Sequence, residues 1–289
     1  MDPDGSRGET RGEPGREARG EPGREARGEP GREARGEPGR EVRGEPGRET
    51  ARPAFYAARP GGWRDWWTLL HPPYSAWHLS YVVIGAAIAP RVHLVRLAAT
   101  LLAFFLAVGV AAHALDELNG RPLRTRIPSA WLVSATLAGL GGALAIGIAG
   151  SIRVGLVLVP FLVVGPFLVV AYNAELFGGI VHTDAGFAAA WGAFPVLAAY
   201  VAQARAVSLG AVGAAAAAFC LSMAQRRLST PARMLRRRAG AVDGTVTLAD
   251  GRELTLDRST LLAPLEGALA MTAWGIVLFA TALAVARLG

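Results

Sequence analysis

Long apolar runs separated by short polar segments dominate the chain after residue 60. A bilayer core about 30 Å thick requires roughly 20 apolar residues of helix to cross it. Several of the runs reach that length, and the polar breaks between them hold most of the arginines. The pattern predicts an all-α, polytopic transmembrane helical bundle of about seven spans, near residues 74–90, 95–117, 128–150, 153–175, 185–204, 207–225 and 262–286.

The N-terminal segment has a different pattern. Near-perfect copies of RGEPGREA begin at Arg11, Arg19, Arg27, Arg35 and Arg43, and each contains Gly and Pro. Such a repeat has too few apolar side chains to offset the loss of chain entropy on folding. We therefore expect residues 1–60 to be a disordered tail, either a spacer or a duplicated segment without a required role, and residues 61–289 to form the membrane domain. The hydrophilic start also predicts no cleavable signal peptide.

The arginines between the spans predict the orientation of the chain. Short loops on the cytoplasmic side of a membrane carry an excess of Lys and Arg. With the N-terminus inside, that side receives 14 of the 19 arginines that follow residue 51, and the opposite side receives only Arg91, Arg96, Arg153, Arg205 and Arg287. We expect a bacterial-type plasma membrane protein with a cytoplasmic N-terminus. Its cytoplasmic loop 228–260 includes a hairpin at Asp250-Gly251.

Charge and cysteine content exclude other classes of function. The tail carries 13 arginines and 13 acids, so the net charge of +7 belongs to residues 61–289. These cations lie between apolar segments, whereas a nucleic-acid protein gathers them on a soluble face. We expect no nucleic-acid partner. Cys220 is the only cysteine, so neither a disulfide framework nor a cysteine metal site is predicted.

Acidic residues occur at the predicted ends of two spans. Asp116 falls in the last turn of the second span, before Gly120 and Pro122, which end the helix. Carboxylates are disfavoured at a helix C-terminus unless a cation compensates them. The fourth span closes in the same way with Asn173 and Glu175, and both ends face the cytoplasm in the predicted topology.

The two acidic ends predict a site for a divalent cation and an anionic group. Mg2+ takes oxygen ligands from carboxylates and phosphates, so we assign Asp116 and Glu175 as its ligands, with His113 as a further one. Arg121, Arg124, Asn119 and Asn173 would bind a diphosphate. The alternative is structural: the arginines follow from the positive-inside rule, and the acids pair with them at the interface.

The motif at residues 112–123 resembles one of the UbiA-type intramembrane prenyltransferases. That family closes its second span with Asn-Asp-x-x-Asp-x-x-x-Asp and an Arg-Pro-Leu-like stretch. Here the stretch from Ala112 to Gly120, followed by Arg121-Pro122-Leu123, is similar to it, and Tyr172–Glu175 resembles a remnant of the second aspartate motif. Asp116 is the one aspartate of the first motif that this chain keeps. The resemblance implies a helical bundle, Mg2+, and transfer of a prenyl group from a prenyl diphosphate to a lipid-soluble acceptor.

Two functions therefore stand after sequence analysis. The first is a UbiA-like membrane protein that binds a prenyl diphosphate and acts as a prenyltransferase if it is active, with Asp116 and Glu175 as its catalytic residues. The alternative is a non-enzymatic transporter or assembly factor that retains the bundle without the chemistry. The missing aspartates and the prolines within spans, such as Pro166 and Pro195, favour the alternative. The oligomeric state is left open.

Overall fold

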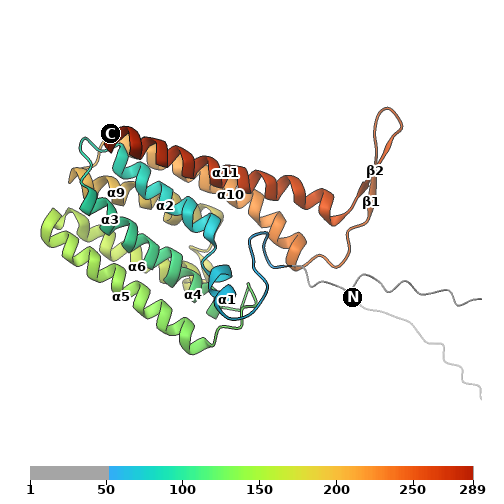
Figure 1. The fold of residues 1–289 in the computed structure, drawn as a ribbon, viewed down its shortest axis with the longest axis horizontal. Coiled ribbons are helices and arrows are strands. Elements are labelled where there is room, and N and C mark those ends of the chain that lie inside the picture. Colours follow the sequence, from blue (N-terminus) through green and yellow to red (C-terminus); the bar gives the residue numbers. More distant parts are fainter. Residues whose placement is uncertain (1–51, 289) are drawn as a thin grey trace, which may run out of the picture. The chain divides into compact units, whose positions relative to one another are not determined.

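A computed structural model describes residues 52–288 of the chain, and these residues form a helical bundle (Figure 1). The repeats, on which the prediction of a disordered tail rests, lie outside the described residues. The helices in chain order are α1 (Trp63–Leu69), α2 (Pro72–Ala87), α3 (Leu94–Phe104), η1 (Phe105–Ala112), α4 (His113–Leu118), α5 (Ser129–Val154), η2 (Leu156–Leu158), α6 (Val159–Asn173), α7 (Leu176–Gly179), α8 (Asp184–Phe187), η3 (Ala188–Ala193), α9 (Phe194–Ala204), α10 (Leu209–Arg237) and α11 (Arg258–Leu288).

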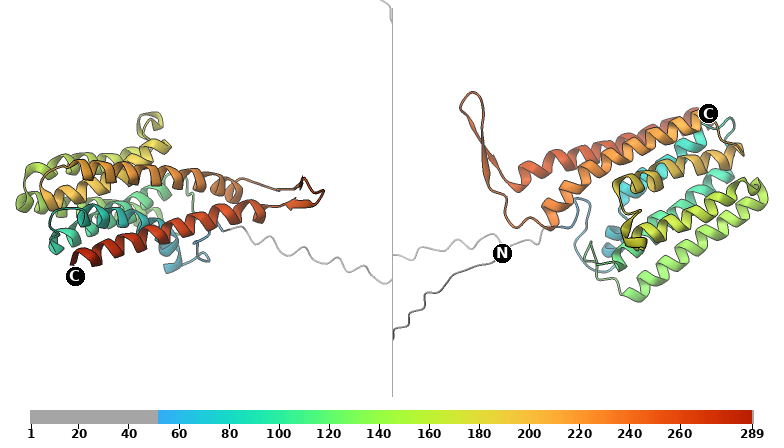
Figure 2. Two further views of the ribbon diagram at one scale, coloured as in Figure 1. Left: turned by 90° about the horizontal axis from the view of Figure 1, so that it is seen from above. Right: turned by 180° about the vertical axis from the view of Figure 1, so that it is seen from behind.

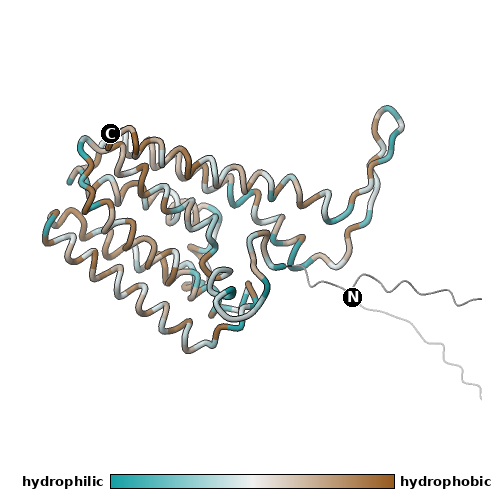
Figure 3. Tube along the Cα trace, viewed as in Figure 1, coloured by the Kyte–Doolittle hydropathy of each residue, from teal (hydrophilic) through white to brown (hydrophobic). Residues whose placement is uncertain are grey.

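Within residues 52–288, six continuous helices are long and apolar enough to cross a membrane. They are Leu94–Leu118, Ser129–Val154, Leu156–Asn173, Asp184–Ala204, Leu209–Arg237 and Arg258–Leu288. Many of their large apolar side chains point outward, including Ile152 and Leu278. Such a surface is stable where lipid covers it, and Figure 3 shows the apolar residues along these helices. The chain is an integral membrane protein, as the apolar pattern predicts.

The first of the seven expected spans corresponds to α2, which has only 16 residues. At 1.5 Å per residue, a helix of this length extends about 24 Å, less than the bilayer core. It lies inside the bundle against α9 and α11, and Trp77 and Tyr81 are almost fully buried. A Cβ atom on Gly85 would lie 2.3 Å from the carbonyl oxygen of Val196, so glycine is required for this close packing.

Two of the long helices contain π-helical turns. η1 lies between α3 and α4, and η3 lies between α8 and α9. Single π-helical segments are rare and occur most often at functional sites. Here they carry Val108 and Trp191, and η1 leads directly into His113.

The chain between α10 and α11 forms the expected hairpin. β1 (Gly244–Thr247) pairs with β2 (Glu253–Leu256) in antiparallel register, and Gly251 occupies the turn with φ +81°. The hairpin projects beyond the bundle (Figure 2). The helix before it is longer than the apolar pattern indicates: α10 continues to Arg237, twelve residues past the expected end at 225. The added turns are rich in Arg, Leu and Met, which are good helix formers.

The arginines divide between the two ends of the bundle. At the end opposite the hairpin, three of them donate to carbonyl groups at or just beyond helix C-termini: Arg287 to Ala87 and Ala89, Arg205 to Arg153, and Arg96 to Ala202 and Gln203. Cations at helix C-termini are stabilising. These arginines therefore have structural partners, while the larger group lies at the end that carries the hairpin and the acidic helix ends.

Candidate functional site

The first acidic helix end closes as its sequence indicates. α4 ends at Leu118, and Gly120 follows with φ +92°. Glu117 is fully buried and accepts hydrogen bonds from the backbone nitrogens of Leu123 (2.9 Å) and Thr125 (2.8 Å) and from the Thr125 hydroxyl (2.8 Å). These hydrogen bonds hold the loop after α4 around the Glu117 carboxylate. The neighbouring Asp116 takes no part in them.

The arginines of that loop have separate environments. Arg121 donates to the carbonyl oxygen of Ile127 (2.6 Å) and the hydroxyl of Ser129 (2.8 Å), with a longer bond to the carbonyl oxygen of Thr125 (3.4 Å). Arg124 is exposed. Neither lines the cavity that opens beside the ends of α4, α6 and α10. Their expected role in binding a diphosphate thus has no support from their positions.

A cavity of about 440 Å³ opens beside the ends of α4, α6 and α10, and we refer to it as the polar cavity. The other five residues that the sequence indicates line it together: His113, Asp116, Asn119, Asn173 and Glu175. The side-chain amide of Asn119 donates to the backbone carbonyl of Asn173 at 3.2 Å. This bond joins the two acidic helix ends, 54 residues apart in the chain.

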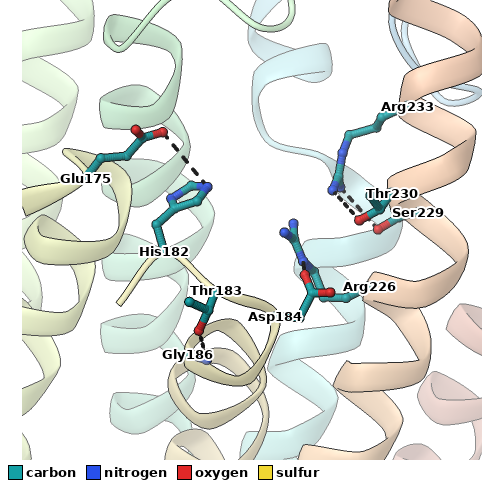
Figure 4. Close-up of polar contacts among 9 residues, drawn as sticks. All are labelled: Glu175, His182, Thr183, Asp184, Gly186, Arg226, Ser229, Thr230 and Arg233. Atoms are coloured by element: carbon teal, nitrogen blue, oxygen red, sulfur yellow. Dashed lines mark hydrogen bonds and ion pairs between the residues drawn. The ribbon is translucent and has the colours of Figure 1, made fainter. Parts of the chain in front are cut away.

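The cations of the polar cavity come from α10. Arg226, Arg233 and Arg237 lie on one side of this helix at spacings of seven and four residues, with Gln225 and Ser229 beside them. Figure 4 shows Arg226 and Arg233 extending from α10, across the view from Glu175 and His182. The apolar pattern places Arg233 and Arg237 in the predicted cytoplasmic loop 228–260, and Arg226 just after the predicted span 207–225. The spacing of seven and four residues, typical of one side of a helix, was the signal that could have identified them. The many polar residues of this segment instead resemble a loop.

The pairing of these arginines is unequal. Arg226 forms an ion pair with Asp184 at 2.7 Å, and the neighbouring Arg236 forms a bidentate pair with Glu266. Among residues 52–288, Arg233 donates only to the hydroxyls of Ser229 and Thr230, each at 3.1 Å. Among the same residues, the Arg237 side chain donates one hydrogen bond, to the carbonyl oxygen of Pro53 at 3.2 Å. Within the described part of the chain, Arg233 and Arg237 have no carboxylate partner.

Four histidines line the polar cavity in a common orientation. A backbone carbonyl only accepts, so a ring nitrogen bonded to it carries the proton. Each Nδ1 therefore donates, and each Nε2 is left as an acceptor when the ring is neutral. Burial, reinforced by the nearby His113, holds the pKa of His71 well below its usual value. The Nδ1 partners are Leu69 for His71 (2.6 Å), Trp191 for His78 (2.9 Å), Gly109 for His113 (3.0 Å) and Tyr172 for His182 (2.9 Å).

The segment that precedes α1 covers part of the polar cavity. Pro53, Ala54, Phe55 and Tyr56 are among its lining residues. The ring of Tyr56 packs edge-on against Tyr74, with centroids 5.5 Å apart. Withdrawal from water, reinforced by Tyr74, raises the pKa of the Tyr56 hydroxyl well above its usual value. This hydroxyl is therefore neutral and able to donate a hydrogen bond into the cavity.

A second cavity, of about 320 Å³, lies among α3, α5, α6 and α9, and we refer to it as the apolar groove. Its walls are almost entirely apolar, with Leu144, Phe161, Leu162 and Phe194 among them. Val108 and Trp191, from the two π-helical turns, line both the groove and the polar cavity. The two cavities are therefore neighbours inside the bundle, one polar and cationic, the other apolar, with these two residues in the walls of both.

The carboxylates do not assemble a metal site by themselves. Among residues 52–288, no three or more His, Cys, Asp or Glu side chains are grouped so that they could hold a metal ion. An oxygen of Glu175 and a nitrogen of His182 are 4.0 Å apart. Mg2+ requires near-octahedral coordination by oxygen. A Mg2+ ion at Asp116 or Glu175 would therefore need phosphate oxygens as further ligands.

No family model, curated protein or solved structure matches this chain. The resemblance to the UbiA-type prenyltransferases accordingly depends on the motif residues themselves.

Proposed function

We propose that the protein is a UbiA-like membrane protein that binds a prenyl diphosphate and transfers its prenyl group to a lipid-soluble acceptor. The observation that carries the proposal is that the polar cavity and the apolar groove are neighbours, with Val108 and Trp191 lining both. A prenyl diphosphate has the matching form, with an anionic head and a long apolar tail. The head occupies the polar cavity, and the tail extends into the groove.

Transfer would break the bond between the first prenyl carbon and the diphosphate oxygen and form a carbon–carbon bond to the acceptor. The diphosphate leaves with the bonding electrons, and fixed positive charge in the cavity wall stabilises it. The acceptor loses a proton to a base. Asp116 and the Nε2 atom of His113, which both line the cavity, are the bases that we assign to this step.

We also propose that α2 is a short seventh span and that the polar cavity faces the cytoplasm of a bacterial-type cell. The arginine excess at the end with the hairpin supports this orientation. With Cys220 replaced by alanine, a membrane-impermeant maleimide applied to intact cells should label Val207→Cys, in the loop before α10. It should not label Asp243→Cys, near the hairpin. The reverse labelling pattern would contradict the orientation.

Direct binding tests the proposed function. Titration of geranylgeranyl diphosphate into the purified full-length protein in nanodiscs should show saturable binding. Inorganic diphosphate lacks the tail and geranylgeraniol lacks the charged head, so each should bind at least about tenfold more weakly, a difference of about 1.4 kcal/mol. Absence of saturable binding to the diphosphate would reject the proposal.

A second function is supported by the single aspartate that remains in the first motif and by the lack of a metal-binding group among the described residues. The protein would then bind or move a phosphorylated lipid without breaking it, as a transporter or assembly factor. The two functions are distinguished by incubating the protein with geranylgeranyl diphosphate and an extract of membrane lipids and measuring the release of diphosphate. Binding without release would favour the non-enzymatic function.

A further inference from the structure

We propose that the head group is bound directly by Arg233 and Arg237, without a divalent cation. This inference rests on the proposed function and names how its site recognises the phosphate. It differs from what the family resemblance implies, because the carboxylates then have no metal to hold.

The first support is the unused capacity of the two arginines. A guanidinium has five N–H donors in a fork that matches two oxygens of a phosphate. Arg233 is held by Ser229 and Thr230 of its own helix, which orient the fork without neutralising it. Arg237 uses its Nε atom for the carbonyl oxygen of Pro53, and its two terminal nitrogens have no hydrogen-bond partner within the described part of the chain.

The second support is the balance of charge. Five arginines and three carboxylates line the polar cavity: Arg226, Arg233, Arg236, Arg237 and Arg238 against Asp116, Glu175 and Glu266. Arg236 is already paired with Glu266, and Arg226 is paired with Asp184 just outside this set. Asp116 lies in the field of Arg237 and Arg233 but forms no ion pair with any described residue. Unpaired cations in a membrane protein usually mark a path or site for a charged ligand.

The third support is independent of charge. Gln225 lines the polar cavity on the same side of α10 and is only 3 % exposed. Its side-chain oxygen has no hydrogen-bond partner among the described residues. A buried polar atom without a partner is costly. A ligand that brings a hydroxyl or a bound water to this position would satisfy it.

The two modes of recognition predict opposite roles for Asp116. If a metal bridges the protein and the phosphate, the carboxylate is required, and its loss abolishes binding. If the arginines bind the phosphate directly, the carboxylate repels the anion and partly neutralises the arginines. Removing its charge then leaves binding unchanged or strengthens it.

The test is titration of geranylgeranyl diphosphate into the full-length protein, once with EDTA and once with Mg2+. We expect the dissociation constants in the two buffers to agree within about threefold, a difference of about 0.7 kcal/mol. Asp116→Asn should bind at least as tightly as the wild type in EDTA. Arg233→Gln should weaken binding at least about tenfold, and Arg233→Lys should recover only part of the loss, because lysine lacks the fork.

Arg227→Gln is the matched control, because Arg227 is exposed on the same helix and does not line the cavity. It should bind like the wild type. Thermal unfolding of every variant shows whether the bundle is intact. Binding that requires Mg2+ and is lost in Asp116→Asn would overturn the arginine mode while leaving the proposed function in place. No binding to the wild type in either buffer would instead reject the proposed function.

Discussion

Two groups of arginines at the same end of the bundle have contrasting environments. Arg121 is bonded to the loop that follows α4, and Arg124 of that loop is exposed. Arg233 and Arg237, more than 100 residues later, line the polar cavity without a carboxylate partner among the described residues. Positive-inside topology accounts for both groups equally well. Only the second group lines the cavity, where its remaining donors can reach a ligand, so position along the chain is a poor guide to which cations bind.

The largest effect is expected from removing both cavity arginines. Arg233→Ala with Arg237→Ala should weaken binding of geranylgeranyl diphosphate about 100-fold or more, because each charged hydrogen bond contributes about 1.5–3 kcal/mol. Titration in nanodiscs measures the change. Arg226→Ala with Asp184→Ala removes a neighbouring cation together with its partner and serves as the comparison. That double variant leaves the net charge unchanged. An equal loss of affinity in it would show that the paired Arg226 matters as much as the unpaired arginines, and would remove the distinction.

A smaller effect on stability is expected in the loop group. Arg121→Ala loses its bonds to Ile127 and Ser129, and we expect a loss of about 2 kcal/mol in the free energy of unfolding. In a domain of this size each kcal/mol lowers the melting temperature by about 2–4 °C, which differential scanning fluorimetry detects. Binding per folded molecule should be unchanged. A large loss of affinity without loss of stability would show that Arg121 takes part in binding the ligand.

His71 sharpens the comparison, because it adds no positive charge to the arginines at neutral pH. The pKa of His71 is lowered in the folded state by burial, while that of an unfolded histidine is about 6.5. Below that pH the unfolded chain takes up a proton that the folded chain resists, so stability falls as the pH decreases. The melting temperature should decline from pH 7 to pH 5, and less steeply in His71→Gln. Parallel declines in the two proteins would contradict a neutral His71.

The smallest effect is expected at Arg124. Its side chain is exposed and lies outside the cavity, and substitutions at such surface positions usually change stability by no more than about 0.5 kcal/mol. Arg124→Gln should therefore match the wild type in both melting temperature and affinity. Weaker binding in this variant alone would show that the loop moves over the cavity when the ligand is present.

Local signals in the sequence predicted much of the fold. The apolar runs mark the long helices, Gly120 and Pro122 mark the end of α4, and Asp250-Gly251 marks the hairpin turn. Each of these features depends on residues close together in the chain. The length of α10 could not be read in this way, because its last three turns are polar on the side that faces the cavity and resemble a loop.

The candidate site was predicted only in part, for a related reason. Asp116, Asn119, Asn173 and Glu175 line one cavity because the topology brings two helix ends together, and alternation of spans already implies that. The bonds that occupy Arg121 depend on how the loop folds around Glu117, and the arginines of α10 reach the cavity through packing against η3. The participation of Mg2+ in binding the diphosphate stays a prediction from the sequence.

The most direct test of the central claim is to locate the prenyl tail. A geranylgeranyl diphosphate analogue with a photoreactive diazirine at the end of its chain can be bound to the protein, cross-linked and mapped by mass spectrometry. We predict labelling in the apolar groove, at Leu144, Phe161 or Leu162, and its loss in the Arg233 and Arg237 double variant. Labelling confined to outward-facing residues of α11 such as Leu278 and Phe279, unaffected by the double variant, would contradict a ligand shared between the two cavities.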